Sequence, residues 1–391
     1  MKSGRNIGWI FLGIILLIIF ASVKELGKKI DKMSTDLKSQ GEKVSVLYDV
    51  VNVEMDLESK KGYLEEKKKE KQLDQQLALP VVQEFKNPQY SYKAKFHPQK
   101  NTFAVVVGDG TLKFFDAMTA QEIKSLRVPD EIINCFAYLY DGKRMVLGTK
   151  TGKIFLTDLE TGQATLVDSI GSRAIARLDA GRNGNVAIGL GGDFEVSKTG
   201  SSGFVYDLNA KKVLSEYSAF FRDDFQGIAI SPAGDVVAIN EIHGKDRGAC
   251  LFDAATGSLI KLCYHSKYSS GPLSVDIAPD GSMMAAGYAP YHVIVWNGRE
   301  GSVQWLLEGH SNWVVSLDFS DDGKFLASGA GDSTARVYDL QTGKEIGRVR
   351  FPGSSTYVDS VDISSDGSLL LAAVDEFIGI YRMPKKVTSS E

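Results

Sequence analysis

A tight turn containing glycine recurs along the second part of the chain at intervals of 42 to 50 residues. Each turn follows a short stretch of alternating apolar and polar residues and precedes an almost wholly apolar one, which is typical of two antiparallel strands joined by a hairpin. The turn glycines are Gly142, Gly184, Gly234, Gly281, Gly323 and Gly367. A period of this length holds four short strands, and neighbouring units bury the faces that a single unit leaves exposed. The repeat therefore restricts this region to an all-β array.

The third strand of each repeat ends in an aromatic or β-branched residue followed by a polar one. These pairs are Phe115-Asp116, Thr157-Asp158, Tyr206-Asp207, Phe252-Asp253, Trp296-Asn297, Tyr338-Asp339 and Tyr381-Arg382. A turn at residues 98–101, with Asn101 in place of glycine, supplies the first of the seven copies. Seven units of four strands are typical of propeller blades. We therefore predict an all-β, seven-bladed β-propeller over residues 80–386, followed by a short tail over 387–391.

The sixth repeat, residues 309–346, carries a resemblance to a known family. It begins with Gly-His and is similar to the WD-repeat pattern almost throughout. The resemblance implies a hydrogen-bonded structural tetrad of His310, Ser328, Asp332 and Tyr338, with tyrosine where the family usually has tryptophan. Only this repeat keeps the Gly-His pair, no repeat keeps the literal Trp-Asp, and repeats three to five depart furthest. The resemblance implies a WD-repeat propeller in which these four residues belong to the scaffold.

The last repeat ends at Tyr381 without a fourth strand. Residues 81–85, directly after Pro80, have the composition of a strand. We predict that they pair with the last strand and close the ring, because this pairing removes an open sheet edge that would invite aggregation.

The N-terminal part contains an uncharged apolar segment, residues 7–23, after a basic tail over residues 1–6. Its 17 residues would span roughly 26 Å as a helix, near the lower limit for crossing a bilayer. We predict a retained transmembrane anchor. The alternative is a cleaved signal peptide, but Ile19 and Ala21 do not form the usual small-x-small cleavage pattern. Flanking charges leave the side of the membrane that carries the propeller undecided.

Residues 24–79 are predicted to form a helical stalk that ends before Pro80. Within them, apolar residues at spacings of three and four suggest a coiled-coil seam between Leu26 and Val51, and thus a homo-oligomer through residues 26–51. Gly41 interrupts the seam. A single amphipathic helix that lies on a partner or on lipid is the alternative.

The three cysteines are Cys135, Cys250 and Cys263. The last two flank one hairpin. If residues 255–257 form a three-residue loop, Cys250 faces Leu262 while Cys263 faces Ala249, so the two sulfurs point to opposite faces. We therefore predict three buried free thiols, which favours a reducing compartment.

Charge and motifs exclude several functions. The net charge of −4 gives no basic footprint for nucleic acid. The sequence has no phosphate-binding loop, no nucleophile elbow and no metal-ligand spacing of His and Cys, so we expect neither an enzyme nor a cofactor or metal site. The alternative, a ligand-sensing or catalytic propeller of the hydrolase or quinone-cofactor kind, predicts a deep polar pocket in the central channel.

The loops carry the functional hypothesis. In the WD-repeat family, the loops between blades and those between second and third strands emerge on one face, and repeats three to five enlarge them here. Exposed aromatic residues and arginine are common in protein interfaces. We therefore expect a membrane-tethered scaffold that binds other proteins through these loops. The candidate residues are Tyr90, Phe220, Phe221, Arg222, His243, Arg247, Tyr268, Tyr288, Tyr291, Trp313 and Tyr357.

The alternative interpretation is that these aromatic side chains fold back under their own loops. For Trp313, that would mean packing along its loop against Tyr357.

Overall fold

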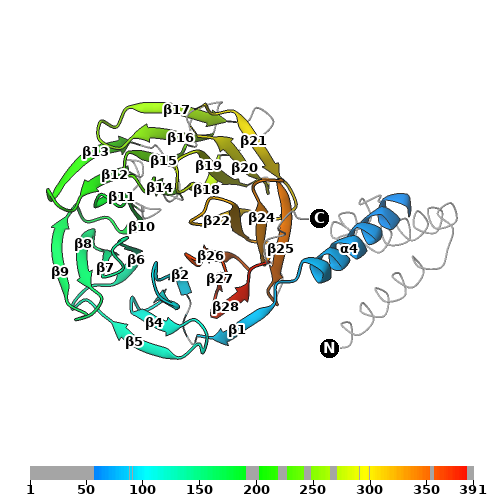
Figure 1. Ribbon diagram of the computed structural model, residues 1–391, viewed down its shortest axis with the longest axis horizontal. Coiled ribbons are helices and arrows are strands. Elements are labelled where there is room, and N and C mark those ends of the chain that lie inside the picture. The colour runs from blue at the N-terminus through cyan, green and yellow to red at the C-terminus, as the bar shows by residue number, and fades with distance from the viewer. Residues whose placement is uncertain are drawn as a thin grey trace, which may run out of the picture. The chain divides into compact units, whose positions relative to one another are not determined.

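The computed structural model describes residues 57–384, except 88, 90, 191–201, 219–226, 242–247, 265–270, 290, 299 and 353–355. Over these residues, the strands form seven four-stranded antiparallel sheets arranged in a ring (Figure 1). The prediction of a seven-bladed propeller is therefore confirmed. We number the sheets as blades in chain order. Blades 1 to 6 are β2–β5, β6–β9, β10–β13, β14–β17, β18–β21 and β22–β25, and blade 7 is β26–β28 with β1.

The strands of each blade run from the centre of the ring to its rim. The innermost strands are β2 (Ser91–Phe96), β6 (Ile133–Tyr138), β10 (Ile175–Ala180), β14 (Ile228–Ile230), β18 (Pro272–Ile277), β22 (Val314–Phe319) and β26 (Val358–Ile363). The second strands are β3 (Thr102–Val107), β7 (Arg144–Thr149), β11 (Asn185–Leu190), β15 (Val236–Glu241), β19 (Met283–Tyr288), β23 (Phe325–Ala330) and β27 (Leu369–Val374).

The third strands are β4 (Leu112–Asp116), β8 (Lys153–Asp158), β12 (Ser202–Asp207), β16 (Gly248–Asp253), β20 (Val293–Asn297), β24 (Thr334–Asp339) and β28 (Phe377–Arg382). The outer strands are β5 (Glu122–Leu126), β9 (Ala164–Ser169), β13 (Lys212–Ser218), β17 (Leu259–Tyr264), β21 (Val303–Leu307), β25 (Lys344–Arg350) and β1 (Val81–Lys86).

The inner hairpins depend on glycine at one position. All six turn glycines named above have positive φ, between 62° and 89°. Residues with a Cβ adopt this conformation at a cost, so glycine fixes where each inner strand turns back. The fold could be predicted from these glycines because each is required by the geometry of its own turn.

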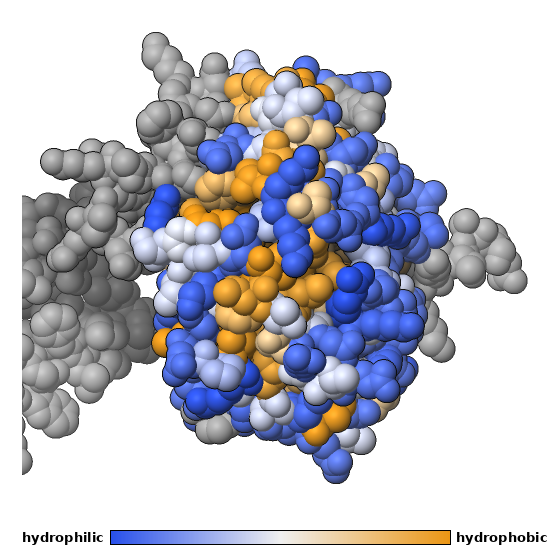
Figure 2. Space-filling model, turned by 90° about the vertical axis from the view of Figure 1, so that its left-hand side faces the viewer, coloured by the Kyte–Doolittle hydropathy of each residue, from blue (hydrophilic) through white to orange (hydrophobic). Residues whose placement is uncertain are grey.

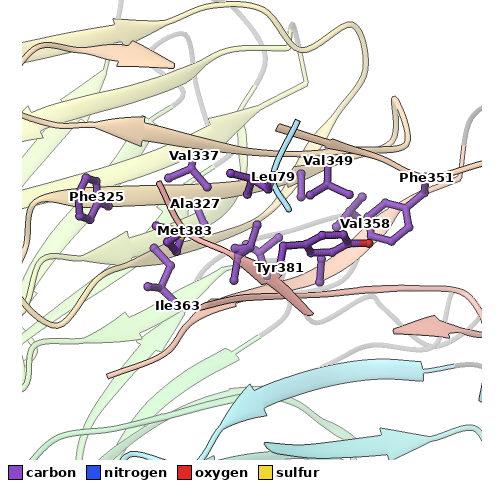
Figure 3. Close-up of a cluster of buried hydrophobic side chains, with 14 of the residues drawn as sticks. Leu79, Phe325, Ala327, Val337, Val349, Phe351, Val358, Ile363, Tyr381 and Met383 are labelled. Atoms are coloured by element: carbon purple, nitrogen blue, oxygen red, sulfur yellow. The ribbon is translucent and has the colours of Figure 1, made fainter. Parts of the chain in front are cut away.

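The hydrophobic core lies in layers between neighbouring blades. One layer joins Ala327, Val337 and Val349 of blade 6 to Val358 and Ile363 of blade 7 (Figure 3). Each blade buries both faces in this way, and only the ring as a whole completes every layer.

The outer strands have mixed surfaces. Several of them expose a large apolar side chain; these are Ile123, Leu166, Leu259 and Val303. On the side of the molecule where β9 and β13 lie, apolar surface alternates with polar side chains (Figure 2).

Ring closure follows the prediction. Strand β1 pairs antiparallel with β28, with Val81 opposite Tyr381. The Tyr381 hydroxyl also donates a hydrogen bond of 2.7 Å to Glu84 Oε1. The N-terminal end of the propeller thus supplies the outer strand of its last blade, as Figure 1 shows for β1 and β28.

The cysteines are also as predicted. Cys250 pairs with Leu262 and Ala249 with Cys263 in the β16–β17 ladder, and the three cysteines are buried and form no disulfide. Burial raises the pKa of Cys135 to about 12 and that of Cys263 to about 11. Both thiols are therefore protonated and weakly nucleophilic at neutral pH.

Helix α4 (Leu57–Leu77) lies almost entirely in a separate compact unit that ends at Gln75, and the propeller unit begins at Gln76. The helix ends before Pro80, where the sequence predicts a stop. Among the described residues, no helix is long and apolar enough to span a membrane. The predicted anchor over residues 7–23 and the predicted seam over residues 26–51 lie outside the described residues.

Candidate protein-interaction face

The tetrad implied by the family resemblance is mostly formed in blade 6. His310 Nδ1 lies 3.0 Å from Asp332 Oδ2, and His310 Nε2 lies 2.7 Å from Ser328 Oγ. Thr334 Oγ1 donates a hydrogen bond of 2.6 Å to Asp332 Oδ1. The side chains of His310 and Asp332 are 1% and 4% exposed, so the network is shielded from water.

The fourth member differs from the expectation. Tyr338 is buried, but its hydroxyl makes no hydrogen bond of normal geometry with the described residues. The ring instead packs in the core layer between blades 5 and 6. A phenol oxygen stands at a different place from an indole N–H, and this explains why Tyr338 keeps the packing role of the usual tryptophan without its hydrogen bond.

The pKa values fit a network that is ionised at Asp332. Burial lowers the pKa of His310, so its ring is neutral at neutral pH. Burial alone would raise the pKa of Asp332, but the hydrogen bonds from His310, Thr334 and the Ser311 N–H outweigh it and hold that pKa well below its usual range. The buried carboxylate is thus stabilised by donors aimed at it.

A second buried network joins the tetrad, and the sequence did not reveal it. The side chain of Arg336 is 2% exposed, with Nη2 3.8 Å from Asp332 Oδ2 and Nη1 3.1 Å from Glu345 Oε2. Arg348 Nε reaches Glu345 Oε1 at 2.6 Å. The available signal was an arginine in the middle of an otherwise apolar strand, since a buried charge requires a partner.

The turn at residues 331–332, which we call the Asp332 turn, forms hydrogen bonds with the loop that carries Trp313. Asp332 Oδ2 accepts the Ser311 N–H at 2.9 Å, and Asn312 Nδ2 donates to Gly331 O at 2.9 Å. The Gly331 N–H in turn donates to Trp313 O at 2.9 Å. The scaffold network therefore fixes the backbone on both sides of Trp313.

The Trp313 side chain itself is 46% exposed. Its ring lies 6.3 Å from that of Tyr357 in a tilted arrangement. Tyr357 packs so closely on Gly331 that a Cβ there would lie 2.6 Å from the tyrosine ring. Trp313 thus contacts Tyr357 and still presents almost half its surface to solvent, which combines the two alternatives that the sequence left open.

Strand order places these residues on one face. In each antiparallel blade, the loop before the innermost strand and the loop between the second and third strands emerge at the same end. We call this end the loop face. Trp313 and Tyr357 precede β22 and β26, while Tyr291, 40% exposed, lies between β19 and β20. Ile132, directly before β6, adds a fourth apolar side chain that is 42% exposed.

Ile132 was not among the candidate residues, and the next residue, Ile133, is the first residue of β6. Ile133 is 1% exposed. Side chains alternate along an extended chain, so the neighbour of a buried residue points outwards, and this alternation is the signal that could have identified Ile132.

Tyr288 is a correction. We expected it on an exposed loop, but it is the last residue of β19, 0% exposed, with its ring 6.3 Å from that of Trp296. It belongs to the core layer between blades 4 and 5 and presents no surface to a partner. The candidates Tyr90, Phe220, Phe221, Arg222, His243, Arg247 and Tyr268 lie outside the described residues.

Charged pairs occupy the loop face of blades 1 and 2. Arg127 is paired with Asp109, and Lys153 Nζ lies 2.5 Å from Glu131 Oε1. Such partly exposed pairs contribute little stability, but they give a polar rim to an interface.

The opposite end of the central channel holds a polar cavity of about 140 Å³. Its wall includes Lys95 and four aspartates, one from each of four innermost strands. Each carboxylate accepts a backbone N–H of the following blade, at 2.7 to 2.9 Å. The bonded pairs are Asp179 with Ile230, Asp276 with Phe319, Asp318 with Ile363 and Asp362 with Phe96.

These carboxylates therefore connect neighbouring blades. Lys95 Nζ adds contacts of 3.5 Å to Asp362 and 3.9 Å to Asp318. A polar central cavity was the expected mark of the ligand-binding alternative, and here its carboxylates already serve as acceptors between strands. Within the described part of the chain, no three His, Cys, Asp or Glu side chains are grouped so that they could hold a metal ion.

The cavity predicts a pH dependence of stability. Burial, together with repulsion by Asp179, raises the pKa of Asp276 to about 7. A raised folded-state pKa means that the folded protein binds more protons, so stability falls as pH rises from about 4 to about 7. Asp276→Asn keeps an acceptor for Phe319 and removes the charge. It should raise the melting temperature at pH 8 by about 2–4 °C and have no such effect at pH 4, measured by differential scanning calorimetry. An equal effect at both pH values would contradict this account.

The comparisons with known proteins agree with the geometry. The family model of the WD domain, G-beta repeat, matches residues 301–339, which include β22, β23 and β24. The guanine nucleotide-binding protein subunit beta of Solanum tuberosum is 22% identical over 287 residues, covering 71% of this chain and 64% of the relative.

Shorter matches reach higher identity. The guanine nucleotide-binding protein subunit beta-5b of Danio rerio is 32% identical over 108 residues, 27% of this chain and 26% of the relative. The eukaryotic translation initiation factor 3 subunit I of Schizosaccharomyces pombe is 28% identical over 111 residues, 27% of this chain and 33% of the relative. The chain thus spans about a quarter to a third of the length of such relatives.

Proposed function

Because this chain is a WD-repeat β-propeller, we propose that it is a non-enzymatic scaffold that binds another protein through the loop face around Trp313. The observation that carries the proposal is the contrast between the backbone and the side chain at this position. Hydrogen bonds from the Asp332 turn and Gly331 fix the loop, while the indole remains 46% exposed.

A large aromatic side chain held in a fixed position is well suited to binding. Leaving it in water is unfavourable, and its rigid support means that little conformational entropy is lost when a partner covers it. Tyr357 and Tyr291 extend the apolar area, and the paired charges of blades 1 and 2 supply a polar rim. The names of two relatives describe them as subunits of larger assemblies, which supports the same role.

Affinity capture with a matched pair of variants tests this proposal. Trp313→Ala should reduce partner recovery at least tenfold, the effect of losing about 1.4 kcal/mol or more at an interface hot spot. Tyr140→Ala is the control, because Tyr140 is also 36% exposed but lies on an inner hairpin at the opposite face. Both variants should melt within about 2 °C of the wild type, as surface changes do. Equal loss of capture in both variants, or in neither, would contradict the proposal.

We further propose that residues 7–23 tether the scaffold to a membrane, with residues 24–79 as a helical stalk. The support is the uncharged apolar segment in the sequence and the helix over Leu57–Leu77. The full-length protein should remain in the membrane pellet after carbonate extraction, and release into the supernatant would contradict the anchor.

Cysteine labelling can then determine the orientation. The three native thiols are buried at 1% exposure, so an impermeant maleimide should react only with an introduced Ser389→Cys. Labelling of intact cells would place the propeller outside the membrane, and labelling only after permeabilisation would place it inside.

A further inference from the structure

A groove with apolar walls and polar edges opens between blades 4 and 5 on the face opposite the loop face. Its volume is about 260 Å³. We call it the 4–5 groove. Its apolar walls are Val236, Leu251 and Ile260 of blade 4 and Ile277, Met284 and Gly298 of blade 5, and its rim includes Ser231, Asp235 and Asp280.

The strand registers show which residues between blades 6 and 7 correspond to those that line the 4–5 groove. At that equivalent position the groove is filled. There, Phe325 stands at the position of Val236, and Met383 at that of Gly298. Both side chains belong to the buried layer between these blades (Figure 3). The 4–5 groove is open partly because valine and glycine are much smaller.

A third side chain in the filled groove comes from outside the blades. Ala78 forms a parallel bridge with Arg348 of β25, and the Leu79 N–H donates to Arg348 O at 3.0 Å. Leu79 is 7% exposed and packs over Gly347, where a Cβ would lie 2.5 Å from Leu79 Cδ2 (Figure 3). An extended apolar segment thus adds to the outer strand of blade 6 and inserts a leucine between two blades.

Other grooves are closed by a side chain of the outer strand. Lys124 donates to Leu159 O between blades 1 and 2, Ser215 Oγ to Ala254 O at 2.7 Å between blades 3 and 4, and Trp305 Nε1 to Leu340 O at 2.9 Å between blades 5 and 6. The equivalent residue of blade 4 is Lys261. In the described part of the chain, it makes no such bond to Gly298 O, and its side chain lies against Gly301.

The outer strand beside the 4–5 groove is an exposed apolar edge. Leu259, Ile260 and Tyr264 of β17 are 56%, 38% and 47% exposed. An edge strand offers backbone N–H and C=O groups to an added strand, and side-chain pockets beside it provide selectivity. Asp235 and Asp280 at the rim favour a basic residue in the segment that binds.

We propose that an extended segment of a partner protein, carrying a leucine and a basic residue within a few positions before it, adds in parallel to β17 and inserts the leucine into the 4–5 groove. The bound leucine takes a place like that of Leu79 between blades 6 and 7, beside Lys261, which stands at the position of Gly347 and whose side chain lies against Gly301. This surface is separate from the loop face, so a partner can bind here while another protein covers Trp313.

The test uses the full-length chain and a synthetic, fluorescein-labelled peptide with the sequence of residues 75–82, QQLALPVV, and a second peptide with Gln76→Lys. Fluorescence anisotropy should show saturable binding with a Kd on the order of 100 µM for the first peptide, typical of a single short segment, and tighter binding for the second. Lys261→Trp, which copies the tryptophan that closes the groove between blades 5 and 6, should weaken binding at least tenfold. Ile260→Asp, in the apolar wall of the groove, should also weaken binding and provides a second, independent variant.

Controls separate this site from the others. Leu166→Asp, on the exposed outer strand β9 of blade 2, and Trp313→Ala, on the loop face, should leave peptide binding unchanged. In methyl-labelled protein, the peptide should shift the resonances of Leu251, Ile260 and Met284. Three results would overturn the proposal without affecting the loop-face proposal. These are the absence of saturable binding, binding that neither Lys261→Trp nor Ile260→Asp weakens, and shifts confined to Val337 and Ile346 of the filled groove.

Discussion

Replacing Asp332 with alanine is expected to lower the free energy of unfolding of the propeller by about 3 kcal/mol. The carboxylate accepts hydrogen bonds from His310, Thr334 and the Ser311 N–H, and it faces the Arg336 guanidinium at 3.8 Å. Because His310 and Arg336 are almost fully buried, removing the carboxylate leaves a polar group and a charge in the interior with fewer partners.

Thermal melting measures the effect. The melting temperature of Asp332→Ala should fall by about 6 °C. Asp332→Asn, which keeps acceptor oxygen but removes the charge, should lie between the alanine variant and the wild type. Asp322→Ala is the control, since the Asp322 side chain is 39% exposed on the inner hairpin of the same blade. A melting temperature unchanged in Asp332→Ala would mean that the tetrad does not support the blade.

Removing the closing strand should have a still larger effect. A chain that begins at Asn87 lacks β1, so β28 becomes an open edge and the apolar contacts of Val82 and Phe85 are lost. Phe85 lies 5.2 Å from the ring of Phe115, centroid to centroid. Losing two such side chains costs about 1.5–3 kcal/mol each, and the lost ladder with β28 adds to this.

The matched control begins at Gln76, the first residue of the propeller unit. This chain should be monomeric and fold cooperatively, whereas the chain from Asn87 should aggregate or melt at least about 10 °C lower. Size-exclusion chromatography and circular dichroism distinguish the two results. Equal stability of both chains would show that closure does not depend on β1. The point substitution Phe85→Ala provides a milder test of the same contact.

The features that the sequence predicted are those with a local physical cause. Gly142 and Gly367 mark inner hairpins because the turn requires positive φ. The hairpin length fixes the register that separates Cys250 from Cys263. The closing role of residues 81–85 followed from the need to pair the edge of the last sheet.

The features that the sequence did not predict depend on which strands and which blades become neighbours in the folded ring. Whether Tyr288 ends a strand or begins a loop is decided by its packing against Trp296, 8 residues further along the chain on the next strand. Arg336 and Glu345 meet only after β24 and β25 pair. The filling of one groove by Leu79 and the opening of another beside Val236 depend on which blades become neighbours, and the repeat pattern carries no such information.

Hydrogen–deuterium exchange of the protein in complex with its captured partner tests the loop-face proposal most directly. Residues 309–313 and 356–357, which carry Trp313 and Tyr357 on the loop face, should exchange more slowly in the complex than in the free protein. The inner hairpin at residues 320–324, at the other end of the same blade, should exchange equally in both. Protection of residues 320–324 with unchanged exchange at 309–313 would place the partner on the opposite face and contradict the account.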